Sequence, residues 1–196
     1  MRGALRLPAR VWRGLARSAA LALVAGLASQ AAAELVSARY ISPTDRYPHG
    51  GLGDPSEYTG LEAREANGQV HRLSWDRPLV FEDVAPRLVD VDLDGTPELL
   101  VVESHEQLGA RFSIYDLVEG RLSPMVSSPH IGTRFRWLAI VGAADLDGDG
   151  FVEIAYVDRP HLARTLRIWR VDASGETVRV SQVAELVGVT NHRIGE

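Results

Sequence analysis

The hydrophobic residues from position 34 onward fall into short runs that end in turns, and no window keeps a helical apolar period for three turns. Residues 99–102 and 154–157 are continuously apolar, which is the pattern of strands buried on both faces. Other runs alternate apolar and polar residues, as half-buried strands do: 70–75, 111–115, 166–171 and 178–181. Turn-forming pairs separate the runs: Asn67-Gly68, Glu119-Gly120 and Ser174-Gly175. The pattern predicts an all-β chain built from hairpins.

The chain also contains an internal repeat. Residues 90–98 read Asp-Val-Asp-Leu-Asp-Gly-Thr-Pro-Glu, and residues 145–153, which begin 55 positions later, read Asp-Leu-Asp-Gly-Asp-Gly-Phe-Val-Glu. After each copy come a short apolar strand, a polar connection and a strand that carries aromatic residues. A weaker third copy begins at residues 52–57, and a fourth opens at residues 191–196. Units of about 40–55 residues with several strands each are typical of β-propeller blades.

The number of blades follows from the length of the chain. At about 50 residues per blade, residues 34–196 supply about three blades, whereas closed propellers have about four to eight. The chain ends in a polar segment and not in a strand that would close a blade, and open strand edges promote aggregation. We therefore expect an all-β fold of β-propeller-type blades, in a region that is C-terminally truncated relative to a longer propeller.

Residues 1–33 have a different composition. They contain five arginines and no acidic residue, and a short apolar run follows the basic stretch. Ala31 and Ala33 stand at positions −3 and −1 of a cleavage point before Glu34. This order of segments is typical of a secretory signal peptide, and a membrane span needs about 20 apolar residues, roughly twice as many. The sequence predicts a cleaved signal peptide at 1–33, a periplasmic or secreted protein, and no stable membrane insertion after cleavage.

Charge and composition exclude some classes of function. All 21 basic residues are arginines. Positions 34–196 contain 16 of them and 26 acidic residues, so the formal charge of that region is −10. Because nucleic-acid affinity comes from neutralising phosphates, we expect no nucleic-acid partner. The chain has no cysteine, which excludes disulfides, thiolate nucleophiles and cysteine-ligated zinc. The hydrophobic share of 45% is sufficient for one folded core.

The two matched loops are candidates for metal binding. Each has aspartates at positions 1, 3 and 5, which repel one another unless a cation lies between them, and a glycine at position 6 that permits a sharp turn. Calcium takes six to eight oxygen ligands and tolerates irregular carboxylate geometry. A backbone carbonyl near Thr96 or Phe151 would add one oxygen to each site. The sequence predicts two structural Ca²⁺ sites with these side-chain ligands: Asp90, Asp92, Asp94 and Glu98, and Asp145, Asp147, Asp149 and Glu153.

These loops have two other interpretations. An EF-hand places a bidentate glutamate at position 12 between two helices, but position 12 is Val101 in one copy and Tyr156 in the other, each inside a strand. The EF-hand is therefore excluded. The second alternative is a pair of solvated hairpin turns that hold no metal, and the recurrence of the same pattern before equivalent strands favours metal over it.

The loop followed by a hydrophobic strand resembles the FG-GAP/VCBS repeat, which forms calcium-loop blades of integrin-α-type propellers and of many exported bacterial proteins. The resemblance covers residues 86–118 and 140–171 and is faint for 47–64, so we assign no metal to the third copy. It implies that the alternate aspartates and the final acid of the two matched loops hold calcium at a blade edge. The chain is also similar to bacterial VCBS proteins of unknown role that share the stretches at 156–161 and 190–195 and continue beyond this C-terminus.

Other polar residues point to alternatives. His49, His130 and His192 each precede a turn that contains glycine, and their convergence on a propeller channel would provide a transition-metal site or an acid and a base. Hydrogen bonds from each histidine to loop backbone are the simpler expectation. Asp158 is expected to form a surface ion pair with Arg159 or Arg164. Three tryptophans in strands, Trp75, Trp137 and Trp169, are expected to fill the core between blades.

No residue pattern identifies a reaction. The chain lacks the Gly-x-Ser-x-Gly and His-Glu-x-x-His motifs of common hydrolases. We expect an exported calcium-binding β-propeller repeat protein that acts as a scaffold or binding module for a protein or glycan. The alternative is a hydrolase or lyase that uses the histidine-bearing loops around a propeller channel.

Overall fold

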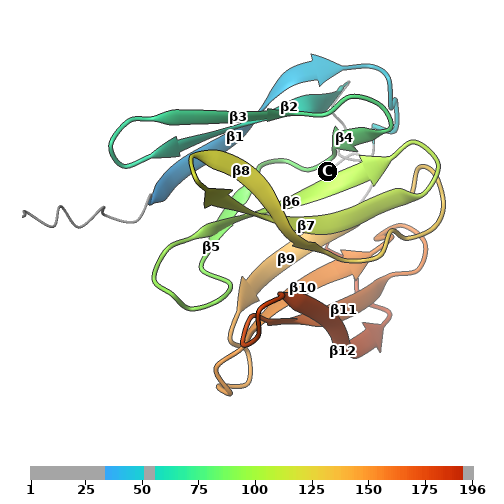
Figure 1. Cartoon of the computed structure of the whole chain (residues 1–196). Coiled ribbons are helices and arrows are strands. Elements are labelled where there is room, and N and C mark those ends of the chain that lie inside the picture. The colour runs from blue at the N-terminus through green and yellow to red at the C-terminus, as the bar shows by residue number, and fades with distance from the viewer. Residues whose placement is uncertain (1–33, 51–55, 192–196) are drawn as a thin grey trace, which may run out of the picture. The chain divides into compact units, whose positions relative to one another are not determined.

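The computed structural model describes residues 34–50 and 56–191, which form twelve β-strands and, within these ranges, no helix (Figure 1). The strands are β1 (Leu35–Thr44), β2 (Glu57–Glu65), β3 (Val70–Ser74), β4 (Leu79–Phe81), β5 (Arg87–Val89), β6 (Glu98–His105), β7 (Gly109–Val118), β8 (Arg121–Ser127), β9 (Leu138–Ala144), β10 (Val152–Asp158), β11 (Thr165–Asp172) and β12 (Arg179–Val187). All pairings among them are antiparallel. The prediction of an all-β chain of hairpins is confirmed.

The internal repeat corresponds to two antiparallel meanders of four strands. Strands β5, β6, β7 and β8 pair in sequence order, and so do β9, β10, β11 and β12 (Figure 1). Each acidic loop joins the first strand of its meander to the second, since residues 90–97 connect β5 to β6 and residues 145–151 connect β9 to β10. The two loops therefore occupy equivalent places in the topology.

The sheets differ from a set of separate blades. The second meander is a four-stranded sheet by itself, whereas the first shares an eight-stranded sheet with β1–β4 because β4 pairs with both β2 and β6. Neither a closed barrel nor a closed propeller is formed by the part of the chain that the structure describes. The third copy predicted at 52–57 and the fourth at 191–196 fall almost entirely outside the described residues, although the hairpin expected after the third copy is present as β2 and β3.

Strand β6 is buried on both faces, as its continuous apolar sequence predicts. Leu100 and Val102 pack in one core cluster with residues of the second meander, while Leu99 and Val101 pack in another cluster with β2. Phe112 of β7 packs between the two sheets: its ring centroid lies 6.1 Å from that of Tyr156 and 6.0 Å from that of Trp169. The three tryptophans lie in or against these two clusters.

No helix among the described residues has the length and apolar character needed to cross a membrane. The predicted signal peptide at 1–33 lies outside the described residues.

Candidate metal centre

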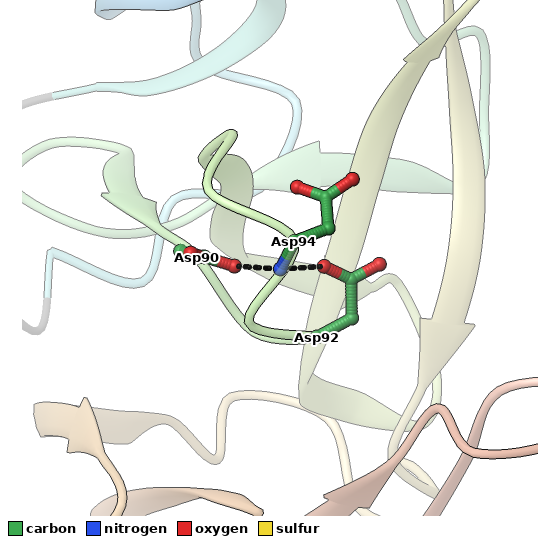
Figure 2. A group of neighbouring side chains, drawn as sticks. All are labelled: Asp90, Asp92 and Asp94. Atoms are coloured by element: carbon green, nitrogen blue, oxygen red, sulfur yellow. Dashed lines mark hydrogen bonds between the residues drawn. The ribbon is translucent and has the colours of Figure 1, made fainter.

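The first acidic loop is organised around its own backbone. Oxygens of Asp90 and Asp92 both accept a hydrogen bond from the backbone N–H of Asp94, at 3.1 and 3.2 Å (Figure 2). The second oxygen of Asp90 accepts from Gly95 N–H at 3.0 Å. Gly95 has a φ of 94°, so the left-handed turn predicted at position 6 is present. This geometry brings carboxylate oxygens of the three aspartates within 4.8 Å of one another.

The second loop repeats the same arrangement. Asp145 accepts hydrogen bonds from the N–H groups of Gly148 at 2.7 Å and Gly150 at 3.0 Å, and the bond from Gly150 lowers the pKa of Asp145. Gly150 has a φ of 87°, matching Gly95. The carboxylate oxygens that converge within 4.8 Å here belong to Asp145, Asp147 and Glu153.

The ninth residue has the same structural role in both loops. An oxygen of Glu98 accepts a hydrogen bond from Val91 N–H at 2.8 Å, and an oxygen of Glu153 accepts from Leu146 N–H at 3.0 Å. Both glutamates are 2% exposed. Each glutamate therefore links the first residues of its loop to the start of the following strand by a hydrogen bond. Among the predicted ligands, Glu98 is absent from the first convergent group and Asp149 from the second.

The two loops differ in the residue that faces the final glutamate from the next strand. In the second meander this residue is Arg170, which pairs with Glu153 in the β10–β11 register. Its guanidinium contacts three carboxylates, those of Glu153 at 2.8 Å, Asp149 at 2.8 Å and Asp147 at 2.9 Å. A positive charge of the chain itself thus lies among the acids of the second loop.

Asp116 takes the equivalent position in the first meander. Leu99 pairs with Tyr115, which places Asp116 beside Glu98, where the second meander has Glu153 and Arg170. Burial, reinforced by the negative charges of Asp92 and Asp116, raises the pKa of Glu98 to about 7. Partial burial and the neighbouring carboxylates also raise the pKa of Asp92. The first loop therefore concentrates five acidic residues, and no ion pair of the described residues involves any of them.

The two donor sets fit a hard divalent cation to different degrees. Carboxylate oxygens are the ligands that calcium prefers, and the first loop offers them without a competing cationic side chain. In the second loop a cation would have to displace the guanidinium of Arg170 from three carboxylates. Sequence reasoning missed both Arg170 and Asp116, because the facing residue is known only once the register of the two strands is known.

The two described histidines that the sequence analysis singled out, His49 and His130, have different partners. His49 bonds through Nδ1 to the buried carboxylate of Glu82. His130 bonds to the carbonyl oxygen of Gly109 at 2.8 Å and contacts the ring of His105, and burial lowers the pKa of His130. The backbone contact expected for these histidines is thus present for His130. His192 lies outside the described residues.

An ion pair is present at Asp158 as expected, but Asp158 is buried and not at the surface, and it has two arginine partners. Arg159 donates to both oxygens of Asp158, at 2.7 and 3.0 Å, and Arg167 donates to one of them at 3.1 Å. The second partner is Arg167 and not Arg164, because Arg167 lies on β11, which pairs directly with β10.

Comparison with known proteins adds no relative: no protein-family model, no curated protein and no solved structure matches the chain.

Proposed function

We propose that this chain is an exported calcium-binding repeat protein of the FG-GAP/VCBS type, whose meanders are β-propeller blades and which acts as a scaffold or binding module for a protein or glycan. The observation that carries the proposal is the convergence of the Asp90, Asp92 and Asp94 oxygens within 4.8 Å, without a basic side chain paired to them. Like charges held this close favour binding of a cation, and calcium suits a flexible all-oxygen site.

Two further observations support the blade interpretation. The two meanders have the same strand order, and each places its acidic loop between the first and second strands. Apolar side chains on strand β12 are exposed, with Val183 at 48%, Leu186 at 59% and Val187 at 71%. Because successive side chains of a strand point to opposite faces, these residues lie on both faces of an edge strand, which a further blade or a partner protein would cover.

Thermal unfolding with and without calcium tests the proposal. For a site with a Kd near 0.1 mM, about 1 mM calcium stabilises the folded state by about 1.4 kcal/mol, which raises the unfolding midpoint by roughly 3–6 °C in a chain of this size. The double variant Asp90→Asn, Asp92→Asn should lose this shift. The matched control Asp76→Asn, an exposed aspartate outside both loops, should keep it. An equal midpoint in calcium and in excess chelator would refute the proposal.

A further inference from the structure

A cavity of about 310 Å³ lies away from the acidic loops, where three loops of the described chain meet. This volume is at the lower end of the range for small-molecule pockets, about 300–1,000 Å³. The loops are the one after β1, the one before β9 and the one between β10 and β11. Its polar and aromatic lining consists of His49, Phe135, Arg136, Trp137, Arg159 and His161.

A buried carboxylate holds His49 at this cavity. Glu82, which is 1% exposed, accepts a hydrogen bond from Nδ1 of His49 through one carboxylate oxygen and from the hydroxyl of Ser104 through the other. Because a carboxylate accepts, Nδ1 of His49 is the donor in this pair. The other ring nitrogen, Nε2, is therefore the atom of His49 that can bond to a molecule in the cavity.

The aromatic side of the cavity is also held in place. The Phe135 ring stacks on His49, with centroids 5.5 Å apart and planes 18° from parallel, and its backbone N–H donates to the hydroxyl of Tyr47 at 2.9 Å. Trp137 is 5% exposed, and its indole N–H donates to the backbone carbonyl of Glu82 at 2.9 Å. The cavity thus combines fixed flat apolar surfaces with a positioned imidazole.

The charged residues that line the cavity are all basic. Arg136 and Arg159 are lining residues, and none of the described acidic residues lines the cavity. Arg136 takes part in none of the ion pairs among the described residues, and one of its nitrogens donates to a backbone carbonyl at 2.7 Å. Arg159 pairs with Asp158, and Arg167 pairs with both Asp158 and Glu185, so this network of two arginines and two carboxylates is balanced in charge. Among the described lining residues, Arg136 therefore carries a positive charge that no ion pair neutralises, in a domain whose formal charge is negative.

We propose that this cavity binds a small organic anion, a carboxylate or phosphate attached to a flat apolar body. The guanidinium groups of Arg136 and Arg159 bind the oxyanion, because planar guanidinium matches the geometry of both acids. Nε2 of His49 provides a further bond, and the Phe135 and Trp137 surfaces contact the apolar body. From the sequence, His49 was a candidate for a shared histidine site, Arg159 for an ion pair and Trp137 for the core, and the structure places all three at the lining of this cavity.

The test follows the indole N–H signal of Trp137 in ¹⁵N-labelled full-length protein during titration with three probes of similar shape. 2-Naphthoate and 2-naphthyl phosphate carry the two acids, and 2-naphthylmethanol is their neutral counterpart. The expected dissociation constant for the better acid is on the order of 1 mM, the affinity of small probes with ordinary ligand efficiency. We expect the neutral probe to bind at least tenfold more weakly. The preferred acid shows which oxyanion the cavity favours.

Arginine variants separate local binding from general attraction of anions. Arg136→Gln should weaken binding of the better acid about tenfold, as loss of a charge-assisted hydrogen bond does. Arg121→Gln removes the same charge from an exposed side chain that does not line the cavity, so it should change binding less than twofold.

Three results would overturn the proposal: equal binding of acid and neutral probes, equal weakening by both arginine variants, or no response of the Trp137 signal to any probe. The titration is run in calcium and again in chelator. The cavity shares no residue with the acidic loops, so we expect that anion binding does not depend on calcium binding. If the calcium proposal fails, the titration in calcium-free buffer still tests the anion proposal.

Discussion

The facing residues Asp116 and Arg170 lead to a specific prediction about calcium stoichiometry. Counting Asp116 with the four loop acids gives the first loop a formal charge of −5, whereas Arg170 reduces the second loop to −3. The guanidinium also occupies oxygens that calcium would need, since it lies 2.8–2.9 Å from three carboxylates. We therefore expect one calcium ion per chain at about 0.1–1 mM, bound by the first loop.

Two substitutions should change this number in opposite directions. Asp116→Arg supplies the first loop with the guanidinium of the second, so calcium stabilisation should fall from about 1.4 kcal/mol towards zero, and the midpoint shift of roughly 3–6 °C should disappear. Arg170→Gln frees the second loop. Its unfolding midpoint should fall in chelator because Glu153 loses its cation, and its calcium shift should rise to about 6–11 °C.

The assays are thermal unfolding in about 1 mM calcium against excess chelator, and titration calorimetry for stoichiometry. Arg167→Gln is the matched control, because it removes the same charge from the same strand at a site that binds Asp158 and Glu185 and not the loop acids. The reasoning is refuted if Arg170→Gln and Arg167→Gln respond to calcium alike, or if Asp116→Arg still binds one ion.

Three further predictions concern stability. The pKa of Glu98 is raised to about 7 in the folded protein, so the unfolded state releases this proton at a lower pH than the folded state. The free energy of unfolding of the calcium-free protein should therefore fall by up to about 3 kcal/mol as the pH rises from about 4.5 through 7. Urea unfolding at several pH values should show this fall, and Glu98→Gln should abolish it. Leu93 has a φ of 62° at the position where the second loop has a glycine, so Leu93→Gly should raise the melting midpoint by a few degrees, which calorimetry can measure. Arg111→Met should destabilise by about 3–5 kcal/mol in urea unfolding, because it leaves the fully buried carboxylate of Glu103 without its cation. Arg39→Met should cost far less, because the Arg39 side chain is exposed and its partner Glu62 keeps a second arginine, Arg72.

Periodicity predicted the strands that have strong patterns and missed those that do not. The continuous run at 99–102 and the alternating run at 166–171 became β6 and β11, and the predicted turns join the expected hairpins. Strand β9 was missed because its sequence, Leu-Ala-Ile-Val-Gly-Ala-Ala, is rich in small residues that have weak strand preference. Strands β4 and β5 have only three residues each, too few for any periodicity.

The connection of strands between repeats was not predictable from local sequence. A repeat pattern suggests separate blades, but the short β4 pairs with β2 on one side and β6 on the other and so merges the N-terminal strands with the first meander. Such long-range pairing depends on which strand edges are unpaired after each hairpin has formed. The local sequence of β4 does not determine it.

The candidate metal residues show where sequence reasoning reaches its limit. The repeated motif correctly indicated that acids converge, since Asp90, Asp92 and Asp94 lie together, and so do Asp145, Asp147 and Glu153. The motif treats the two loops as equal, yet the electrostatic environment of each is completed by a residue 17 to 18 positions further along, Asp116 or Arg170. The pairing register of the two strands places that residue beside the loop, and the motif itself does not specify the register. We therefore expect two loops with one sequence pattern to differ in cation binding, according to the charge of the residue that faces each loop.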